Sequence, residues 1–208
     1  MLLYFKDTVT GSEGKIDSGA NEVIGEIAGK GSASLLTTVY FFNLLHEEGI
    51  PTHFIGIGEE FGFAANTILV KRAKSYKLEV ICREKAWGSF VRRYGDYVKQ
   101  GDPLPSLVEF TLKDDARGDP LITEDALVAL KIVPKEAAVH MKKTAQRTTQ
   151  VIKNHLAQKG LELIDIKYEF GEVDGETLII DEISGDSMRV VRDGEVLSQN
   201  ELAHSLGL

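Results

Sequence analysis

Charged and apolar residues alternate in the segment LELIDIKYEFG, in the last quarter of the sequence. Successive side chains of a β-strand point to opposite faces, so a strand here places Asp165, Lys167 and Glu169 on one face. Such a strand buries one side and offers two carboxylates and an ammonium group on the other. The apolar residues of the buried side are Ile164, Ile166, Tyr168 and Phe170.

A second run, ETLIIDEIS, carries another carboxylate, Asp181, among apolar residues. The turn residues Asp174 and Gly175 between the two runs predict a hairpin. The residues Val173 to Gly175 suit a three-residue loop with Gly175 in the left-handed position, and such a loop places Glu169 and Asp181 on the same face. A two-residue Asp-Gly turn would separate the two carboxylates.

Two carboxylates held close together repel each other unless a cation neutralises them. Their hard oxygen atoms suit Mg²⁺, which proteins often hold together with nucleotide phosphates. The alternative is a solvated strand face on which Lys167 pairs with its neighbours. Both interpretations stay open on the residues alone.

A second cluster, VICREKAWGSFVRRYG, gathers basic residues around a Gly-Ser step. Arginine binds phosphate or carboxylate through a fork of donors, and a Gly-Ser step that opens a helix adds backbone N–H groups and a hydroxyl. The segment predicts an anion site, with a solvated basic helix face as the alternative. Its basic and small residues are Arg83, Lys85, Gly88, Ser89, Arg92 and Arg93.

The segments FTLKDDARGDPLI and DEISGDSMR crowd charged residues into turns. Loops of this kind are usually solvated, but paired charges beside a strand end also fit a site that binds an amino acid or orients a phosphate. The first segment contains Lys113, Asp114, Asp115, Arg117 and Asp119, and the second contains Ser184, Asp186 and Arg189.

Other motifs favour structural roles. The glycines of TGSEGK and AGKGS do not have Walker spacing, so turns are favoured over a phosphate loop. Trp87 is expected to pack against its neighbours. The histidines show no metal-ligand spacing with Cys82 and are expected at the surface; they are His46, His53, His140, His155 and His204.

Periodicity predicts the elements that position these residues. Apolar residues recur at helical spacing over about 34–48, and a second long helix begins at Pro134 and ends at Gly160. Strands are predicted at 67–72, 79–82 and 107–112, and strands with tight turns over 161–196. The class is therefore α+β, with a lobe boundary near 81–88. The opening segment is predicted as turns, from Gly11, Gly14, Gly19, Gly25, Gly29 and Gly31.

Composition narrows the class of protein. With 208 residues, 43% of them hydrophobic and 27% charged, the chain has the composition of a folded protein. Its net charge of -8 disfavours nucleic acid as a partner. The lone Cys82, and the lack of a signal peptide or of an apolar run of about 20 residues, predict a cytoplasmic protein outside the membrane.

Taken in order, several segments resemble the SAICAR synthetase (phosphoribosylaminoimidazole-succinocarboxamide synthase) family. They are GKGS, EEGIPTHF, LEVICREKAWGSFVRRYG, LKDDARGDPLI, LIDIKYEFG and IIDEISGDSMR, so the likeness runs from about Phe5 to the C-terminus. The resemblance implies a ligase of de novo purine synthesis that joins L-aspartate to carboxyaminoimidazole ribonucleotide with ATP and Mg²⁺. It also implies ATP in a cleft between a β-rich N-terminal lobe, residues 1–82, and a larger substrate- and metal-binding lobe, residues 83–208. The sequence leaves a homodimer open.

The resemblance also assigns roles to single residues. Glu169 and Asp181 would hold the metal, and Lys71, Glu79 and Asp165 would lie on the nucleotide side of the cleft. The ribonucleotide would bind to Arg83, Ser89, Asp186 and Arg189, and the catalytic residues would be Lys113, Asp119 and Lys167.

The sequence departs from the family pattern in three places. Family chains usually begin with a strand-turn-strand of the type YxGKxK over the ATP phosphates, and this sequence begins just after it, with Lys6 in the next matching strand. We therefore expect weaker ATP binding than in a form that carries this segment. The hinge lacks the proline of the family and has Tyr76, Lys77 and Leu78 there. SGDSMR stands where many members have SPDxxR. A nucleotide-binding pseudoenzyme and a ligase acting on another phosphorylated carboxylate are the alternatives.

Overall fold

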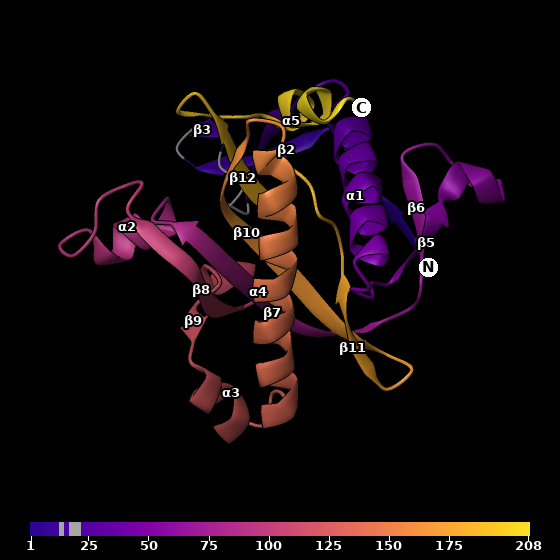
Figure 1. Ribbon diagram of the computed structural model, residues 1–208. Helices are drawn as coiled ribbons and strands as arrows, with labels where there is room; N and C mark the ends of the chain where they lie inside the picture. The colour runs from indigo at the N-terminus through magenta and orange to yellow at the C-terminus, as the bar shows by residue number, and fades with distance from the viewer. Residues whose placement is uncertain (13–14, 17–21) are drawn as a thin grey trace.

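The computed structural model describes residues 1–12, 15–16 and 22–208 (Figure 1). Its centre is a seven-stranded antiparallel sheet in the order β13-β12-β10-β7-β8-β9, with β11 paired to β10. Helices and antiparallel sheets combine as the predicted α+β class requires. The strands of this sheet are β7 (Lys74–Lys85), β8 (Pro103–Leu112), β9 (Leu121–Ile122), β10 (Glu162–Val173), β11 (Glu176–Ile180), β12 (Met188–Arg192) and β13 (Glu195–Val196).

Two smaller sheets come from the first third of the chain. One has the order β1-β6-β5, with β1 at Leu2–Tyr4, β5 at Phe54–Ile57 and β6 at Thr67–Val70. The other has the order β3-β2-β4, with β2 at Thr8–Ser12, β3 at Lys15–Ile16 and β4 at Glu22–Glu26.

The prediction of turns in the opening segment is therefore wrong for β2 and β4, whereas Gly29 lies in a turn as predicted. Gly11 lies in β2 and Gly25 in β4, because the β-forming residues around them pair the two strands and override the glycine signal. Gly14 and Gly19 lie outside the described residues.

The first long helix, α1 (Lys30–Glu47), begins four residues before the predicted start at Ser34. The Asp7 carboxylate explains the difference. It accepts hydrogen bonds from the backbone N–H groups of Gly29, at 3.3 Å, and Gly31, at 2.8 Å. A helix N-terminus has unpaired N–H groups, and here Asp7, from the bend between β1 and β2, satisfies two of them. The remaining helices and 3-10 turns are α2 (Ser89–Tyr94), α3 (Glu124–Ala129), α4 (Lys135–Ala157), α5 (Gln199–Leu206), η1 (Gly58–Phe61) and η2 (Asp115–Arg117).

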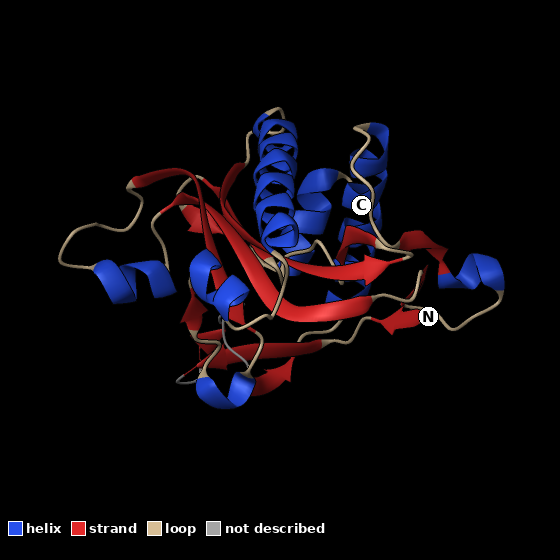
Figure 2. Cartoon of the chain, turned by 90° about the horizontal axis from the view of Figure 1, so that it is seen from below, coloured by secondary structure: helices blue, strands red, loops and turns tan. Residues whose placement is uncertain are grey.

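The second long helix, α4, follows the predicted bounds and packs on one face of the central sheet (Figures 1 and 2). The apolar face of β10 meets it: Tyr168 is 1% exposed, and its hydroxyl is hydrogen-bonded to that of Thr149 at 3.0 Å. The predicted alternation of β10 is confirmed, so this strand divides the hydrophobic core from a polar layer on its other face.

The two-lobed α+β description fits the observed architecture. β7 continues without a break from residue 74 to 85, so the boundary that the sequence places after residue 82 lies inside a strand. The division into residues 1–82 and 83–208 stays a prediction.

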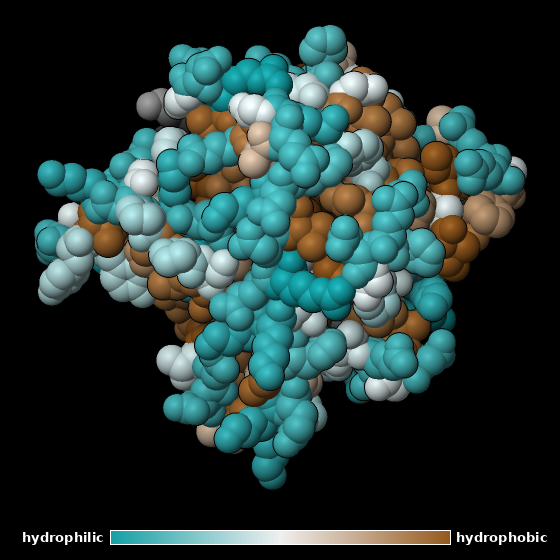
Figure 3. All heavy atoms as spheres, in the orientation of Figure 1, coloured by the Kyte–Doolittle hydropathy of each residue, from teal (hydrophilic) through white to brown (hydrophobic). Residues whose placement is uncertain are grey.

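Hydrophilic side chains cover most of the length of α4 on the outer surface (Figure 3). Hydrophobic atoms gather at the right of this view, over β5 and β6, and Ile55, Phe61 and Phe63 are among the exposed apolar side chains of that part of the chain. Within the described residues, no helix has the length and apolar character needed to span a membrane.

Candidate active site

A pocket of about 180 Å³ opens on the face of the central sheet opposite α4. Strands β7, β8, β10 and β12 form its floor, and α2 and the loops around residues 118–119 and 186–187 form its sides. Most of the site residues predicted from the sequence line it. They are Glu79, Arg83, Ser89, Asp119, Asp165, Lys167, Asp186 and Arg189.

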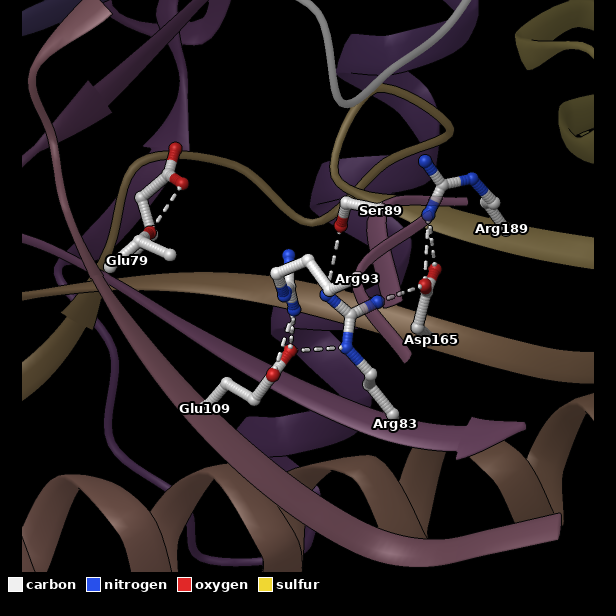
Figure 4. Close-up of polar contacts among 8 residues, drawn as sticks. Glu79, Arg83, Ser89, Arg93, Glu109, Asp165 and Arg189 are labelled. Carbon is white, nitrogen blue, oxygen red and sulfur yellow. Dashed lines mark hydrogen bonds and ion pairs between the residues drawn. The ribbon is translucent and has the colours of Figure 1, made fainter. Parts of the chain in front are cut away.

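Arg83 is the centre of the polar network in this pocket (Figure 4). It is 1% exposed, and its Nε donates to Glu109 at 2.7 Å. Its Nη1 donates to Asp165 at 2.9 Å and its Nη2 to the Ser89 hydroxyl at 3.3 Å. The alternative of a solvated basic helix face is therefore wrong for Arg83, which lies on a strand and is buried.

Strand register places Asp165 between two arginines. Asp165 of β10 is the direct partner of Arg83 on β7 and of Arg189 on β12. A register shift between Leu163 and Asp165 accompanies the pairing with β12. The Arg189 Nη1 donates to the same carboxylate at 2.8 Å. One buried acid thus aligns two guanidinium groups from neighbouring strands.

Glu109, which the sequence analysis missed, performs the same task on the other side of Arg83. It accepts hydrogen bonds from the Arg83 Nε and from the Arg93 Nη2, each at 2.7 Å. The signal was the alternation in LVEFTL, which places Glu109 and Thr111 on the site face of β8. Arg83, Arg93 and Arg189 together outnumber the carboxylates of Asp165 and Glu109, so the cluster carries a net positive charge that suits an anion.

Two further ion pairs lie along the same strands, next to this cluster. The Lys167 Nζ lies 2.8 Å from Glu79, whose other oxygen accepts a hydrogen bond from the Thr111 hydroxyl at 2.9 Å. Burial disfavours the charge on Lys167, but attraction to Glu79, Glu169 and Asp181 together outweighs it and raises the pKa of Lys167. Lys113 forms an ion pair with Glu169 one step further along. Both lysines are therefore held cationic among carboxylates.

The turn that joins β10 to β11 corrects the predicted loop. Val173 pairs with Glu176, so the turn has two residues, Asp174 and Gly175, and not three. Both have positive φ, 52° and 85°, as the favoured two-residue hairpin turn requires. In this register Glu169 pairs with Ile180, so the parity argument from the sequence fails.

The charge of Asp181 nevertheless acts on Glu169. β11 ends at Ile180, and Asp181 lies just beyond it in the left-handed conformation, with φ 68°, so it does not continue the regular alternation of the strand. Burial raises the pKa of Glu169, and the charge of Asp181 raises it further. The same charge helps to raise the pKa values of Lys113 and Lys167, against their burial. Asp181 therefore belongs to the electrostatic environment of the site.

A second pocket, of about 250 Å³, lies between the first strands of the chain and the segment after β11. Its wall includes Lys30, Asp181, Glu182 and Asp186, and Asp186 also lines the first pocket. The Asp186 carboxylate is held by the Lys30 Nζ at 2.6 Å and by the Ser34 hydroxyl at 2.8 Å. The two pockets thus adjoin through one short segment.

Lys30 and Glu182 were missed as site residues. Burial raises the pKa of Glu182 to about 8, and the charges of Asp186 and Asp181 add to this effect. Lys30 is buried at the start of α1, and nothing in the sequence pairs it with Asp186, which lies far away in the chain.

The structure does not bring every predicted residue to these pockets. Lys71 is exposed in the segment after β6 and lines neither of them. Lys113 and Glu169 lie beside the first pocket and do not line it. The expectation of surface histidines is wrong for His53, which is 1% exposed: its ring packs against Phe42 of α1 and contacts the Asp181 carbonyl, and burial lowers its pKa to about 4.

The donor set fits a magnesium ion that is held in part by phosphates. The described residues contain no group of three or more His, Cys, Asp or Glu arranged to hold a metal by themselves. Mg²⁺ is usually bound by one or two carboxylates together with substrate phosphates and water. Glu169 and Asp181 supply such a pair of hard oxygen ligands, and their mutual repulsion favours a cation.

Comparison with known proteins identifies the family. The sequence profile of the SAICAR synthetase family matches residues 1–203. The chain belongs to this family. The phosphoribosylaminoimidazole-succinocarboxamide synthase of Clostridium tetani is 48% identical over 205 residues, which cover 97% of this chain and 88% of that one. The synthase of Thermotoga maritima is 39% identical over 207 residues, covering 99% of this chain and 84% of its own.

Solved structures of SAICAR synthetases have the same fold. The enzyme from Pyrococcus horikoshii matches with a TM-score of 0.81 at 32% identity, over 96% of this chain and 83% of that one. A SAICAR synthetase in complex with ADP matches with a TM-score of 0.82 at 31% identity, over 100% of this chain and 84% of that one. The prediction of an ATP-dependent ligase of purine biosynthesis is therefore confirmed.

Proposed function

We propose that the chain joins L-aspartate to carboxyaminoimidazole ribonucleotide, with ATP and Mg²⁺, in the cytoplasm. One observation supports this most directly: the arginine-rich pocket around Arg83 adjoins, through Asp186, a second pocket whose wall contains the carboxyl groups of Asp181 and Glu182. A phosphorylated carboxylate substrate suits the first pocket, and a magnesium-bound nucleotide suits the second. The ligation then takes place where the two pockets meet.

The ribonucleotide binds to the arginine cluster in this proposal. Arg83 and Arg189 are held in place by Asp165, and Arg93 by Glu109, so their forks are oriented before substrate arrives. The hydroxyl of Ser89, at the start of α2, adds a donor at the same end of the pocket. Preorganised donors of this kind lower the cost of binding an anion.

The reaction proceeds in two steps. An oxygen of the imidazole carboxylate attacks the γ-phosphorus of ATP, ADP leaves, and an acyl phosphate forms. The amine of aspartate then attacks the acyl carbon, phosphate leaves, and the nitrogen loses a proton as the amide forms. Lys167 in the pocket and Lys113 beside it are cations that neutralise charge on the phosphoryl group. Asp119 adds a carboxylate to the wall that suits the incoming amino group of aspartate.

Magnesium would be held by Glu169 and Asp181 together with nucleotide phosphates, and it would neutralise the phosphate charge. Asp165 and Glu79 support the neighbouring cations. Lys71 lines neither pocket, so a nucleotide role for it requires contact with the nucleotide base at a place outside both pockets. The homodimer stays a prediction, which light scattering in solution tests.

A single assay tests the proposal. The chain is incubated with ATP, Mg²⁺, aspartate and carboxyaminoimidazole ribonucleotide, and both ADP and the succinocarboxamide product are measured. We expect the two products in equal amounts and only when all four components are present. ADP release without aspartate-dependent product would refute the ligase assignment, and product from a different carboxylate alone would favour a related ligase.

A further inference from the structure

Asp181 has a backbone conformation that L-residues rarely adopt. Its φ is 68°, in the left-handed region, and it stands directly after the last residue of β11. Aspartate tolerates this region better than most residues, but the conformation persists only where neighbouring groups hold it. Without the left-handed turn, the side chain would continue the alternation of β11 and point away from Glu169. The orientation of the Asp181 carboxylate therefore depends on the contacts that fix this backbone.

His53 contacts two carbonyl groups on this stretch of chain, those of Ile179 and Asp181. Its backbone N–H donates to the Ile179 carbonyl oxygen at 3.1 Å, and its Nε2 lies 3.1 Å from the carbonyl oxygen of Asp181. The neighbouring Thr52 forms a parallel β-bridge with Ile179. The segment around His53 thus clamps the end of β11 on both sides of the turn into Asp181.

The buried imidazole has one further property that points to this contact. Among the described residues, its Nδ1 has no hydrogen-bond partner, although His53 is 1% exposed. An unpaired buried nitrogen is unfavourable, and an apolar side chain of similar size would fill the space beside Phe42 without that cost. Because a carbonyl oxygen only accepts, Nε2 must carry the proton. The hydrogen bond to the Asp181 carbonyl oxygen is an interaction that the imidazole makes and that an apolar side chain could not make.

We propose that His53 is a positioning residue: its Nε2–H donates to the Asp181 carbonyl and so fixes the backbone of Asp181. That backbone in turn directs the Asp181 carboxylate to the metal–nucleotide site. This inference rests on the proposed role of Asp181 as a magnesium ligand. His53 touches neither substrate nor metal, and it acts only through the main chain. Residues that orient a metal ligand in this way typically change metal affinity or activity by about 10- to 100-fold when they are replaced.

The test compares two substitutions of equal length. His53→Gln keeps an N–H donor near the Asp181 carbonyl, and His53→Met removes it. Calorimetry on the full chain measures binding of ADP with Mg²⁺ and of ADP with EDTA. We expect the Met variant to bind Mg·ADP about 10- to 100-fold more weakly, with little change for metal-free ADP, and the Gln variant to retain most of the affinity. KM for the ribonucleotide should stay unchanged in both.

His155→Met serves as the matched control, because His155, in the last turn of α4, also pairs through Nε2, but with the Tyr40 hydroxyl and not with the segment of Asp181. Mg·ADP binding should be unchanged in this variant. Equal affinity of the Met variant and the unaltered chain would overturn the inference, and so would equal losses in the Met and Gln variants. If circular dichroism shows that the Met variant does not fold, His53→Phe replaces it under the same criteria.

Asp181→Asn separates this inference from the proposed function. If Asp181→Asn weakens Mg·ADP binding and His53→Met does not, the metal role of Asp181 stands and the positioning role of His53 is wrong. If Asp181→Asn binds Mg·ADP as the unaltered chain does, the metal assignment is wrong and the role of His53 is overturned with it.

Discussion

Replacing Arg83 by methionine removes the guanidinium group at the centre of the pocket while keeping an unbranched side chain in place of the aliphatic part of the arginine. Breaking a buried ion pair costs about 3–5 kcal/mol when it leaves an uncompensated charge. Here each of the two acids keeps a second arginine, Arg93 for Glu109 and Arg189 for Asp165. We therefore expect a loss near the lower limit, about 3 kcal/mol in the free energy of unfolding.

Urea denaturation, followed by circular dichroism, measures this loss. Lys85→Met is the matched control, because Lys85 lies two residues further along β7 and pairs with Glu162 at 2.6 Å on the surface, with side chains 33% and 52% exposed. An exposed pair contributes at most about 1 kcal/mol. A loss below about 1 kcal/mol for Arg83→Met, equal to that of the control, would refute the view that the buried network stabilises the protein.

The same variant tests the binding role of the cluster. KM for the ribonucleotide should rise, because Arg83 orients the pocket for an anion, whereas KM for ATP should change little. A kcat and KM indistinguishable from those of the unaltered chain would mean that Arg83 only holds the strands together.

Three further outcomes are expected. Asp181→Asn, or EDTA added to the unaltered chain, should abolish Mg²⁺-dependent turnover, and full activity in either case would contradict the metal role. The pKa of Glu182 is raised from 4.5 to about 8 by burial, so its contribution to stability is present below about pH 4.5 and is lost as the pH rises towards 8. Glu182→Gln should therefore be more stable than the unaltered chain at pH 8 and show a flatter dependence of unfolding free energy on pH between these values. Asp7→Ala removes the cap of α1 and should cost about 1 kcal/mol in thermal or urea unfolding, and an unchanged midpoint would show that water replaces the cap.

Local patterns predicted much of the fold. The alternation of β10 placed Asp165, Lys167 and Glu169 on the site face, and helical periodicity with Pro134 and Gly160 gave the bounds of α4 closely. These signals lie within one element, so they do not depend on how distant parts of the chain meet.

The missing parts depend on contacts between distant residues. The start of α1 is fixed by Asp7, and the pairing of Lys30 with Asp186 joins opposite ends of the chain. Glu109 is one acid in an ordinary alternating strand until Arg83 and Arg93 approach it. Their roles follow from tertiary proximity, which no local spacing encodes.

The hairpin shows a different limit. The parity rule assumes that both strands continue regularly, whereas β11 stops at Ile180 and Asp181 turns into the left-handed region. The predicted meeting of the two carboxylates on one face of paired strands is wrong, and the Asp181 charge acts on Glu169 from beyond the end of β11. Register arguments are reliable only up to the last paired residue.

The alternation of β10 has a consequence for how the gene can vary. Successive residues of this strand face the core and the site in turn: Tyr168 faces α4, and its neighbours Lys167 and Glu169 face the pocket side. Substitutions of similar character leave that assignment intact. A deletion or insertion of one codon within the strand would exchange the two faces for every residue after it, burying charges and exposing aromatic rings at once. Natural length variation should therefore fall in the turns, such as 173–176, and be absent from 164–170 even where residue identities differ widely.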